Sequence, residues 1–122
     1  MSDLAETIDT YLEAYGEADA TRRDSLIARV WADDGQLVDP PFDARGHDGI
    51  SGMAAAVQEQ FPGNTFRRVT AVDSHHGFAR YGWELVGPDG AVTLAGMDVA
   101  ELGEDGRIRR VVGFFGMLPE PR

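Results

Sequence analysis

Two aspartates, Asp98 and Asp39, are the residues of this chain whose positions suggest chemistry. Around Asp98 every second residue is apolar or glycine, namely Val92, Leu94, Gly96, Ala100 and Leu102. Successive side chains of a strand point to opposite faces, so this pattern predicts that the Asp98 carboxyl points into the interior. Burying an ionised carboxylate without a partner costs on the order of several kcal/mol. Asp98 therefore needs a counter-charge, hydrogen-bond donors or a proton of its own.

Asp39 ends a second short strand, predicted over residues 36–39, directly before Pro40 and Pro41. An ionised aspartate can remove a proton from a substrate, and a protonated one can donate a hydrogen bond to developing negative charge. Two inward acids in a chain of 122 residues thus indicate a site for acid–base chemistry. The alternative for Asp39 is a structural one, because Asp commonly caps turns through its carboxylate.

The periodicity of the sequence predicts the elements that must position these acids. Apolar residues at three- and four-residue steps predict helices over residues 3–18, 21–31 and 48–61, the second opened by a capping box at Thr21–Asp24 and stopped at residues 33–35. Residues 40–47 are expected to form a loop. From residue 64 the period changes to two, which predicts strands over residues 65–72, 78–86, 91–102 and 107–115.

This order of elements predicts one α+β domain over residues 1–118, with the helices on one face of a curved antiparallel sheet, and a loose tail at 119–122. The other face of the third long strand carries Thr93, Ala95, Met97 and Val99. These side chains are too apolar to face water, so we expect a second copy of the chain to cover them in a homodimer.

Composition excludes several classes of function. The formal net charge of −10 disfavours nucleic acid and anionic membranes as partners, and the absence of cysteine rules out disulfides, thiolate zinc sites and iron–sulfur clusters. The N-terminus has no signal-peptide pattern and no stretch approaches the roughly 18 apolar residues of a membrane span, so a cytoplasmic location is expected. Neighbouring His75 and His76 would point to opposite faces of a strand, and His47 lies elsewhere; neither a metal nor another cofactor is expected.

Two blocks of sequence carry a resemblance to a known family: ADDGQLVDP, in which four residues separate ADD from DP, and GMDVAELGEDGRI. With the order of elements, they resemble the NTF2-like superfamily, in its SnoaL-like and ketosteroid isomerase-like branch, over nearly the whole chain. The resemblance implies a cone of three N-terminal helices on a curved antiparallel sheet. It does not imply one reaction, since this fold carries isomerases, cyclases, epoxide hydrolases and non-catalytic binding proteins.

In the ketosteroid isomerases, the general base is an Asp at the end of the first strand, and the oxyanion hole combines a Tyr of the first helix with a protonated Asp of a late strand. The resemblance implies Asp39 as the base and Asp98 as a donor. The tyrosine position falls on Tyr11 if the turn between the first two helices is longer here than in the family, and on Tyr15 otherwise. We expect Tyr11. The ligand would then be a small apolar carbonyl or polyketide-like compound, bound without a cofactor.

Ten apolar or aromatic residues are candidates for the walls of the pocket, and each could equally belong to the core: Tyr15, Trp31, Phe42, Met53, Val57, Phe61, Tyr81, Trp83, Val112 and Phe114.

Arg80 opens two alternatives to the isomerase-like site. If the strand register lets Arg80 pair with Asp98, the aspartate is ionised and cannot donate, which favours a non-catalytic binding protein. If Arg80 faces the pocket between Asp39 and Asp98, an Asp-Arg-Asp set could hydrolyse an epoxide. A third register would put Ala79 opposite Asp98 and leave the carboxyl free, and the sequence does not decide the register.

Overall fold

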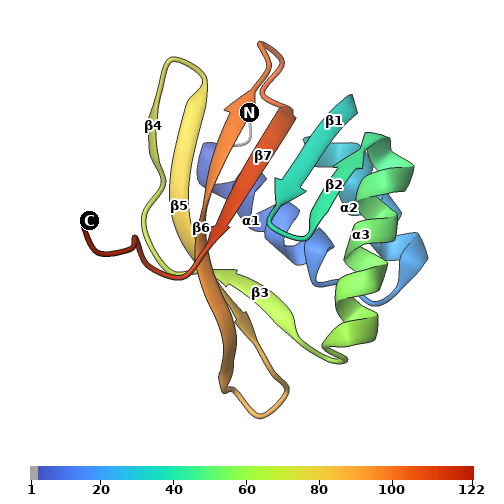
Figure 1. Cartoon of the computed structure of the whole chain (residues 1–122). Coiled ribbons are helices and arrows are strands. Elements are labelled where there is room, and N and C mark those ends of the chain that lie inside the picture. Colours follow the sequence, from blue (N-terminus) through green and yellow to red (C-terminus); the bar gives the residue numbers. More distant parts are fainter. Residues whose placement is uncertain (1–2) are drawn as a thin grey trace.

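Residues 3–122, which the computed structural model describes, fold into three helices on one side of a curved seven-stranded sheet (Figure 1). The helices are α1 (Leu4–Tyr15), α2 (Ala20–Val30) and α3 (Gly46–Gln60). Helix α1 forms because its apolar residues share one face, and the buried side chains of that face include Ile8, Tyr11, Leu12 and Tyr15. The Asp3 side chain caps its first turn by accepting a hydrogen bond from the Glu6 amide.

The strands are β1 (Trp31–Asp39), β2 (Phe42–Arg45), β3 (Thr65–Arg68), β4 (Asp73–His75), β5 (Phe78–Val86), β6 (Val92–Leu102) and β7 (Ile108–Phe115). They pair in the order β2-β1-β7-β6-β5-β3, and β4 also pairs with β5. The pairing of β1 with β7 is parallel and the other pairings are antiparallel. The α+β class and the helix-covered curved sheet are confirmed, whereas the sheet is mixed and not purely antiparallel.

The second helix starts and ends earlier than predicted. Asp19 is its N-cap and accepts a hydrogen bond from the Thr21 amide, so the capping box at Thr21–Asp24 is wrong. Trp31 begins β1 and does not end the helix. The acidic segment 33–35, predicted as a helix stop, lies within β1, where an irregular pairing with β7 between Trp31 and Gln36 accommodates it.

Strand β2 was predicted as a loop because the segment is rich in proline, glycine and aspartate. It forms a hairpin with β1 in which Asp39 lies opposite Phe42, and α3 follows it directly. The predicted strand 65–72 is shorter, since β3 ends at Arg68 and β4 begins at Asp73. The hairpin helps to build the site, because it holds Asp39 and Phe42 opposite each other at one end of the sheet.

The core lies between the helices and the concave face of the sheet, where Ile8, Leu37, Trp31, Ile108 and Val111 are almost fully buried. No helix within residues 3–122 has both the length and the apolar character needed to cross a membrane. Beyond Phe115 the chain forms no further helix or strand and runs away from the sheet (Figure 1).

Candidate acid–base site

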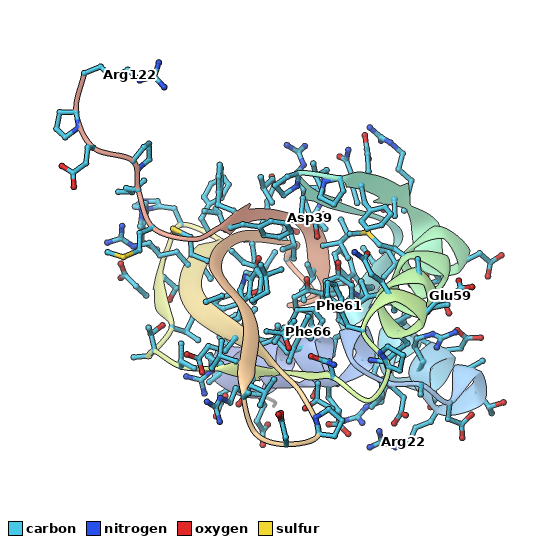
Figure 2. The ribbon with its side chains drawn as sticks, turned by 60° about the horizontal axis from the view of Figure 1, so that its bottom comes forward. Arg22, Asp39, Glu59, Phe61, Phe66 and Arg122 are labelled. Atoms are coloured by element: carbon cyan, nitrogen blue, oxygen red, sulfur yellow. The ribbon has the colours of Figure 1, made fainter. Side chains whose placement is uncertain are left out.

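A cavity of about 240 Å³ lies between helices α1 and α3 and the concave face of the sheet, and both Asp39 and Asp98 line it. In Figure 2, Asp39, Phe61 and Phe66 lie around the same central region, whereas Arg22 and Glu59 lie at the periphery. One wall is a run of aromatic rings: Phe66 stacks on Tyr15 at 4.5 Å between ring centroids and meets Trp83 edge-on at 5.5 Å. The walls are mostly apolar, and the polar side chains among the lining residues are two aspartates, two tyrosines, Gln60 and Trp83.

Asp98 is held by two donors from the neighbouring strand. The register of β5 and β6 places Tyr81 opposite Asp98, and the Tyr81 hydroxyl donates to Oδ2 at 2.8 Å. The Trp83 indole N–H donates to Oδ1 at 2.9 Å. Gly96 makes room for that indole, because a Cβ atom there would lie 2.6 Å from the Trp83 ring. The Asp98 side chain is therefore fixed by hydrogen bonds and not by a counter-charge.

The surroundings of Asp98 keep it close to the point of ionisation at neutral pH. Asp98 is only 4% exposed, and burial raises the pKa of its carboxyl to about 7. The hydrogen bonds from Tyr81 and Trp83 act in the opposite direction, and the negative charge of Asp39 adds to the rise. A carboxyl with such a pKa is protonated in a large fraction of molecules at pH 7, and a protonated carboxyl can donate.

Asp39 lies at the end of β1 in a different environment. The Tyr15 hydroxyl donates to its Oδ2 at 2.9 Å, whereas its Oδ1 is buried and makes no hydrogen bond within residues 3–122. Burial raises the pKa of Asp39, and the Tyr15 hydroxyl and the nearby Phe42 amide oppose the rise. An ionised carboxylate at the wall of the cavity can accept a proton.

Tyr11 also lines the cavity, and the charges of both Asp98 and Asp39 act on its hydroxyl. Burial raises the pKa of its hydroxyl well above the usual value, and among the charged neighbours Asp98 adds most to the rise. Its ring packs edge-on against Trp31 at 5.5 Å. The described donors to the two carboxylates come from Tyr15, Tyr81 and Trp83, and Tyr11 is not among them.

Gly113 of β7 separates the two carboxyl groups. A Cβ atom on this residue would lie 3.0 Å from Asp98 Oδ1 and 3.3 Å from the Asp39 Cβ. Strand β7 lies between β1 and β6 in the sheet, so Asp39, Gly113 and Asp98 lie on three adjacent strands. The missing side chain lets Asp39 and Asp98 pack closely against β7, and any side chain at this position would press on both residues.

Half of the predicted wall residues line this cavity, and they are Tyr15, Phe42, Val57, Phe61 and Trp83. The other five predicted residues do not line this cavity. Trp31 and Met53 are buried in the core. Tyr81 lies opposite Asp98 on the neighbouring strand and donates a hydrogen bond to it. Val112 and Phe114 lie on the other face of β7, where Phe114 is 54% exposed.

The error on β7 has a physical reason. The segment reads Val111, Val112, Gly113, Phe114, Phe115, so both of its faces are apolar and alternation alone does not decide which one is inside. The structure buries Val111 and Gly113 and directs Phe115 to the cavity. A shift by one residue exchanges the faces of the whole strand.

Nine lining residues are not among those predicted from the sequence: Leu12, Leu37, Pro41, Gln60, Phe66, Leu85, Leu94, Gly113 and Phe115. The helical stripe of α1 contains Leu12, and period-two alternation from Trp83 and Asp98 reaches Leu85 and Leu94, so these could have been found. Nothing local in the sequence marks Pro41, Gln60 or Gly113.

Arg80 does not approach the site. It lies opposite Val99 in the register and its side chain, 68% exposed, donates from Nε to Asp73 Oδ2 at 2.8 Å. The Asp98–Arg80 ion pair and the Asp-Arg-Asp hydrolase site are therefore wrong. Among the described residues that line the cavity, none is Lys, Arg or His.

The histidines also lie outside the cavity. His75 and His76 are exposed at the β4–β5 turn, with 3.0 Å between their Nδ1 atoms, and His47 Nε2 lies 3.0 Å from the Trp31 carbonyl oxygen. Residues 3–122 contain no group of three or more His, Cys, Asp or Glu side chains arranged to hold a metal ion.

Comparison with known proteins agrees with this architecture. The SnoaL-like domain model matches residues 8–111, and the chain belongs to this family. A "putative isomerase of the SnoaL-like family" from Agrobacterium tumefaciens str. C58 is 38% identical, with a TM-score of 0.88, over 96% of this chain and 100% of that one.

Two more distant structures share the fold. An NTF2-like protein of unknown function from Exiguobacterium sp. 255-15 is 22% identical with a TM-score of 0.68, over 92% of this chain and 99% of that one. A "putative polyketide cyclase" from Sinorhizobium meliloti is 14% identical with a TM-score of 0.66, over 88% and 93% of the two chains. No curated protein sequence matches the chain.

Proposed function

We propose that this protein is an acid–base enzyme that needs no cofactor and enolises a small apolar carbonyl or polyketide-like compound. One observation carries the proposal: Asp39 and Asp98 face a single apolar cavity, yet each carboxyl has its own hydrogen-bond donors and its own degree of burial. Paired acids in different environments are how one site supplies both a base and an acid at the same pH.

In the proposed reaction Asp39 is the general base. It removes a proton from the carbon next to the substrate carbonyl, the C–H electron pair forms the new C=C bond, and the carbonyl π pair moves to the oxygen. The protonated Asp98 and the Tyr11 hydroxyl donate hydrogen bonds to that oxygen. Asp39 then returns the proton to carbon, so no redox partner or other reactant is required.

The size and charge of the cavity define the substrate further. Its volume of about 240 Å³ is below the roughly 300–1,000 Å³ of sites for drug-sized ligands, which favours a compound of one or two rings. Two carboxyls and no cationic lining side chain among the described residues favour an uncharged substrate over a carboxylate or a phosphate. The relatives named as an isomerase and a polyketide cyclase support the same class of reaction.

The experiment is α-proton exchange of 2-tetralone, a two-ring ketone, in deuterated buffer, followed by proton NMR. We expect the protein to accelerate exchange and Asp39→Asn to lose at least about 100-fold of the acceleration, as for loss of a general base. The matched control is Asp43→Asn, which removes an exposed carboxylate of β2 that binds Gln36. Exchange no faster than in buffer, or equal exchange by Asp39→Asn, would contradict the proposal.

A further inference from the structure

The turn between β4 and β5 brings two histidine rings together. His75 ends β4 opposite Phe78, and the two residues between the strands, His76 and Gly77, have φ values of 52° and 82°. Positive φ at both positions is typical of a type I′ hairpin turn. Because His76 leaves the extended conformation, its ring turns toward that of His75. The prediction that the two rings point to opposite faces of a strand is therefore wrong.

The two rings face each other through their Nδ1 atoms. These atoms lie 3.0 Å apart, and the ring planes meet at 79°. Both side chains are exposed, and within residues 3–122 each ring has only the other ring as a hydrogen-bond partner. One ring thus donates its Nδ1–H to the Nδ1 of the other. A metal ion that replaced this shared proton would bind both nitrogens at once.

The distance between the two nitrogens fits a pair of metal ligands. A histidine nitrogen binds a metal ion such as zinc at about 2.0–2.1 Å, so two such bonds that meet at a right angle or a tetrahedral angle place the nitrogens about 2.8–3.4 Å apart. The observed 3.0 Å lies within this range. The rings must tilt so that both nitrogens point to one ion, and exposed imidazole rings can do so by rotation about χ2.

The charge around the two histidines favours a cation. Both rings lie on a groove of about 880 Å³ between α1, the β4–β5 turn and the hairpin of β6 and β7. The described lining includes two arginines and five acidic side chains: Glu6, Asp9, Glu13, Glu104 and Asp105. This excess of negative charge raises the local concentration of cations. The groove shares no described lining residue with the cavity of Asp39 and Asp98.

We propose that His75 and His76 together bind a Cu²⁺ ion through their Nδ1 atoms, with water in the remaining coordination positions. Neutral imidazole is a suitable ligand for copper, nickel and zinc, and among these divalent ions a given nitrogen site binds Cu²⁺ most tightly. Nitrogen ligands at right angles also match the tetragonal geometry that Cu²⁺ prefers. The site is separate from the acid–base cavity, so the proposal does not depend on the proposed reaction.

The first experiment titrates the full chain with Cu²⁺ and records electron paramagnetic resonance spectra. We expect one ion per chain, coupled to two nitrogens. His75→Ala and His76→Asn should each leave one coupled nitrogen and weaken the affinity about tenfold or more, because the second ligand no longer binds intramolecularly. Asparagine is chosen at position 76 because it tolerates a positive φ.

His47→Ala is the matched control. The His47 Nε2 atom lies 3.0 Å from the Trp31 carbonyl oxygen, and this ring is not among the described residues of the groove. The variant should keep the affinity for Cu²⁺ within about twofold and the coupling to two nitrogens. A loss of affinity in His47→Ala equal to that in the other two variants would contradict the assignment.

A second experiment locates the ion in the unaltered protein and needs no variant. Bound Cu²⁺ is paramagnetic and broadens the NMR signals of nearby nuclei. Less than one equivalent of Cu²⁺ should therefore broaden the amide signals of His75, His76 and Gly77 before those of other residues. Absence of Cu²⁺ binding, equal affinity in His75→Ala and His76→Asn, or broadening centred on the acidic residues of α1 would overturn the proposal.

Discussion

Tyr81 lies directly opposite Asp98 on the neighbouring strand, and its hydroxyl donates a hydrogen bond to Asp98 Oδ2 at 2.8 Å. Trp83, two residues further along the same face of β5, holds the other oxygen at 2.9 Å. One strand therefore supplies both donors to the buried acid. Burial, and not an ion pair, sets the charge of this acid, and several measurable properties depend on that difference.

The indole signals of the two tryptophans should report the ionisation of Asp98. In ¹⁵N–¹H NMR spectra, the Trp83 signal should titrate with a midpoint near pH 7, because its N–H binds Asp98, whose pKa is raised to about 7. The Trp31 indole N–H is buried without a partner in the described structure, so its signal should stay constant. Ionisation strengthens the Trp83 hydrogen bond, which moves the signal downfield as the pH rises.

Two variants check the origin of that titration. Asp98→Asn should abolish it, and Arg80→Ala should leave it unchanged, because Arg80 pairs with Asp73. A Trp83 midpoint below pH 5, or a shift caused by Arg80→Ala, would show that Asp98 is an ion-paired carboxylate.

The stability of the protein should fall as the pH rises through the range in which Asp98 ionises. The folded-state pKa of about 7 lies above the ordinary value of 3.8, so between these pH values the folded protein retains a proton that the unfolded chain releases. At 1.36 kcal/mol per unit, the free energy of unfolding falls by on the order of 4 kcal/mol between about pH 4 and pH 7 through this group. Burial of Asp39 acts in the same direction.

Urea unfolding at pH 4.5 and pH 8 measures this effect. Asp98→Asn should lose most of the pH dependence and be more stable than the unaltered protein at pH 8, because it buries no charge. The same pH dependence in both proteins would mean that other groups cause it.

Removing the Tyr15 hydroxyl should change the ionisation of Asp39. The hydrogen bond from Tyr15 stabilises the ionised form, so Tyr15→Phe should raise the pKa of Asp39, measured by ¹³C NMR of the carboxyl carbon. Tyr11→Phe is the matched control from the same helix face and should move the pKa of Asp39 less, because Tyr11 is not among the described donors to Asp39. Equal shifts in the two variants would refute the distinction between the tyrosines.

We also propose that a second copy of the chain covers the outer face of the sheet. Phe114 lies on that face and is 54% exposed, next to Met97 in the register of β6 and β7. Light scattering should give twice the chain mass of 13.3 kDa, and Phe114→Glu should give the single mass. Val92→Glu, at an equally exposed apolar residue near the start of β6, should remain a dimer. A monomeric unaltered protein rules the interface out.

The sequence was sufficient to place Asp98 inside, because its strand alternates clearly between apolar and polar faces over many residues. It was insufficient for β7, whose two faces are both apolar, and for the acidic start of β1, whose strand conformation depends on pairing with β7. In both cases the conformation or the buried face of the strand depends on pairing with a strand that is distant in the sequence.

The site shows the same division. Asp39, Asp98 and Tyr11 could be proposed from the resemblance of two short blocks, and all three line the cavity. The role of Tyr81 as a donor to Asp98 could not be predicted, because it depends on the register of a hairpin. A slip of two residues would have placed Ala79 opposite Asp98 instead. The place of Gly113 at the site could not be predicted either, because a glycine has no side chain whose type would indicate a role.

The parallel pairing of β1 with β7 decides when the site can exist during biosynthesis. Asp39 emerges from the ribosome early, whereas the strand that holds it beside Asp98 begins only at Ile108. A nascent or proteolytically shortened chain that lacks β7 would contain Asp39 and Asp98 but not the strand that lies between them in the sheet. The site should therefore form last, together with closure of the longest loop in the sheet.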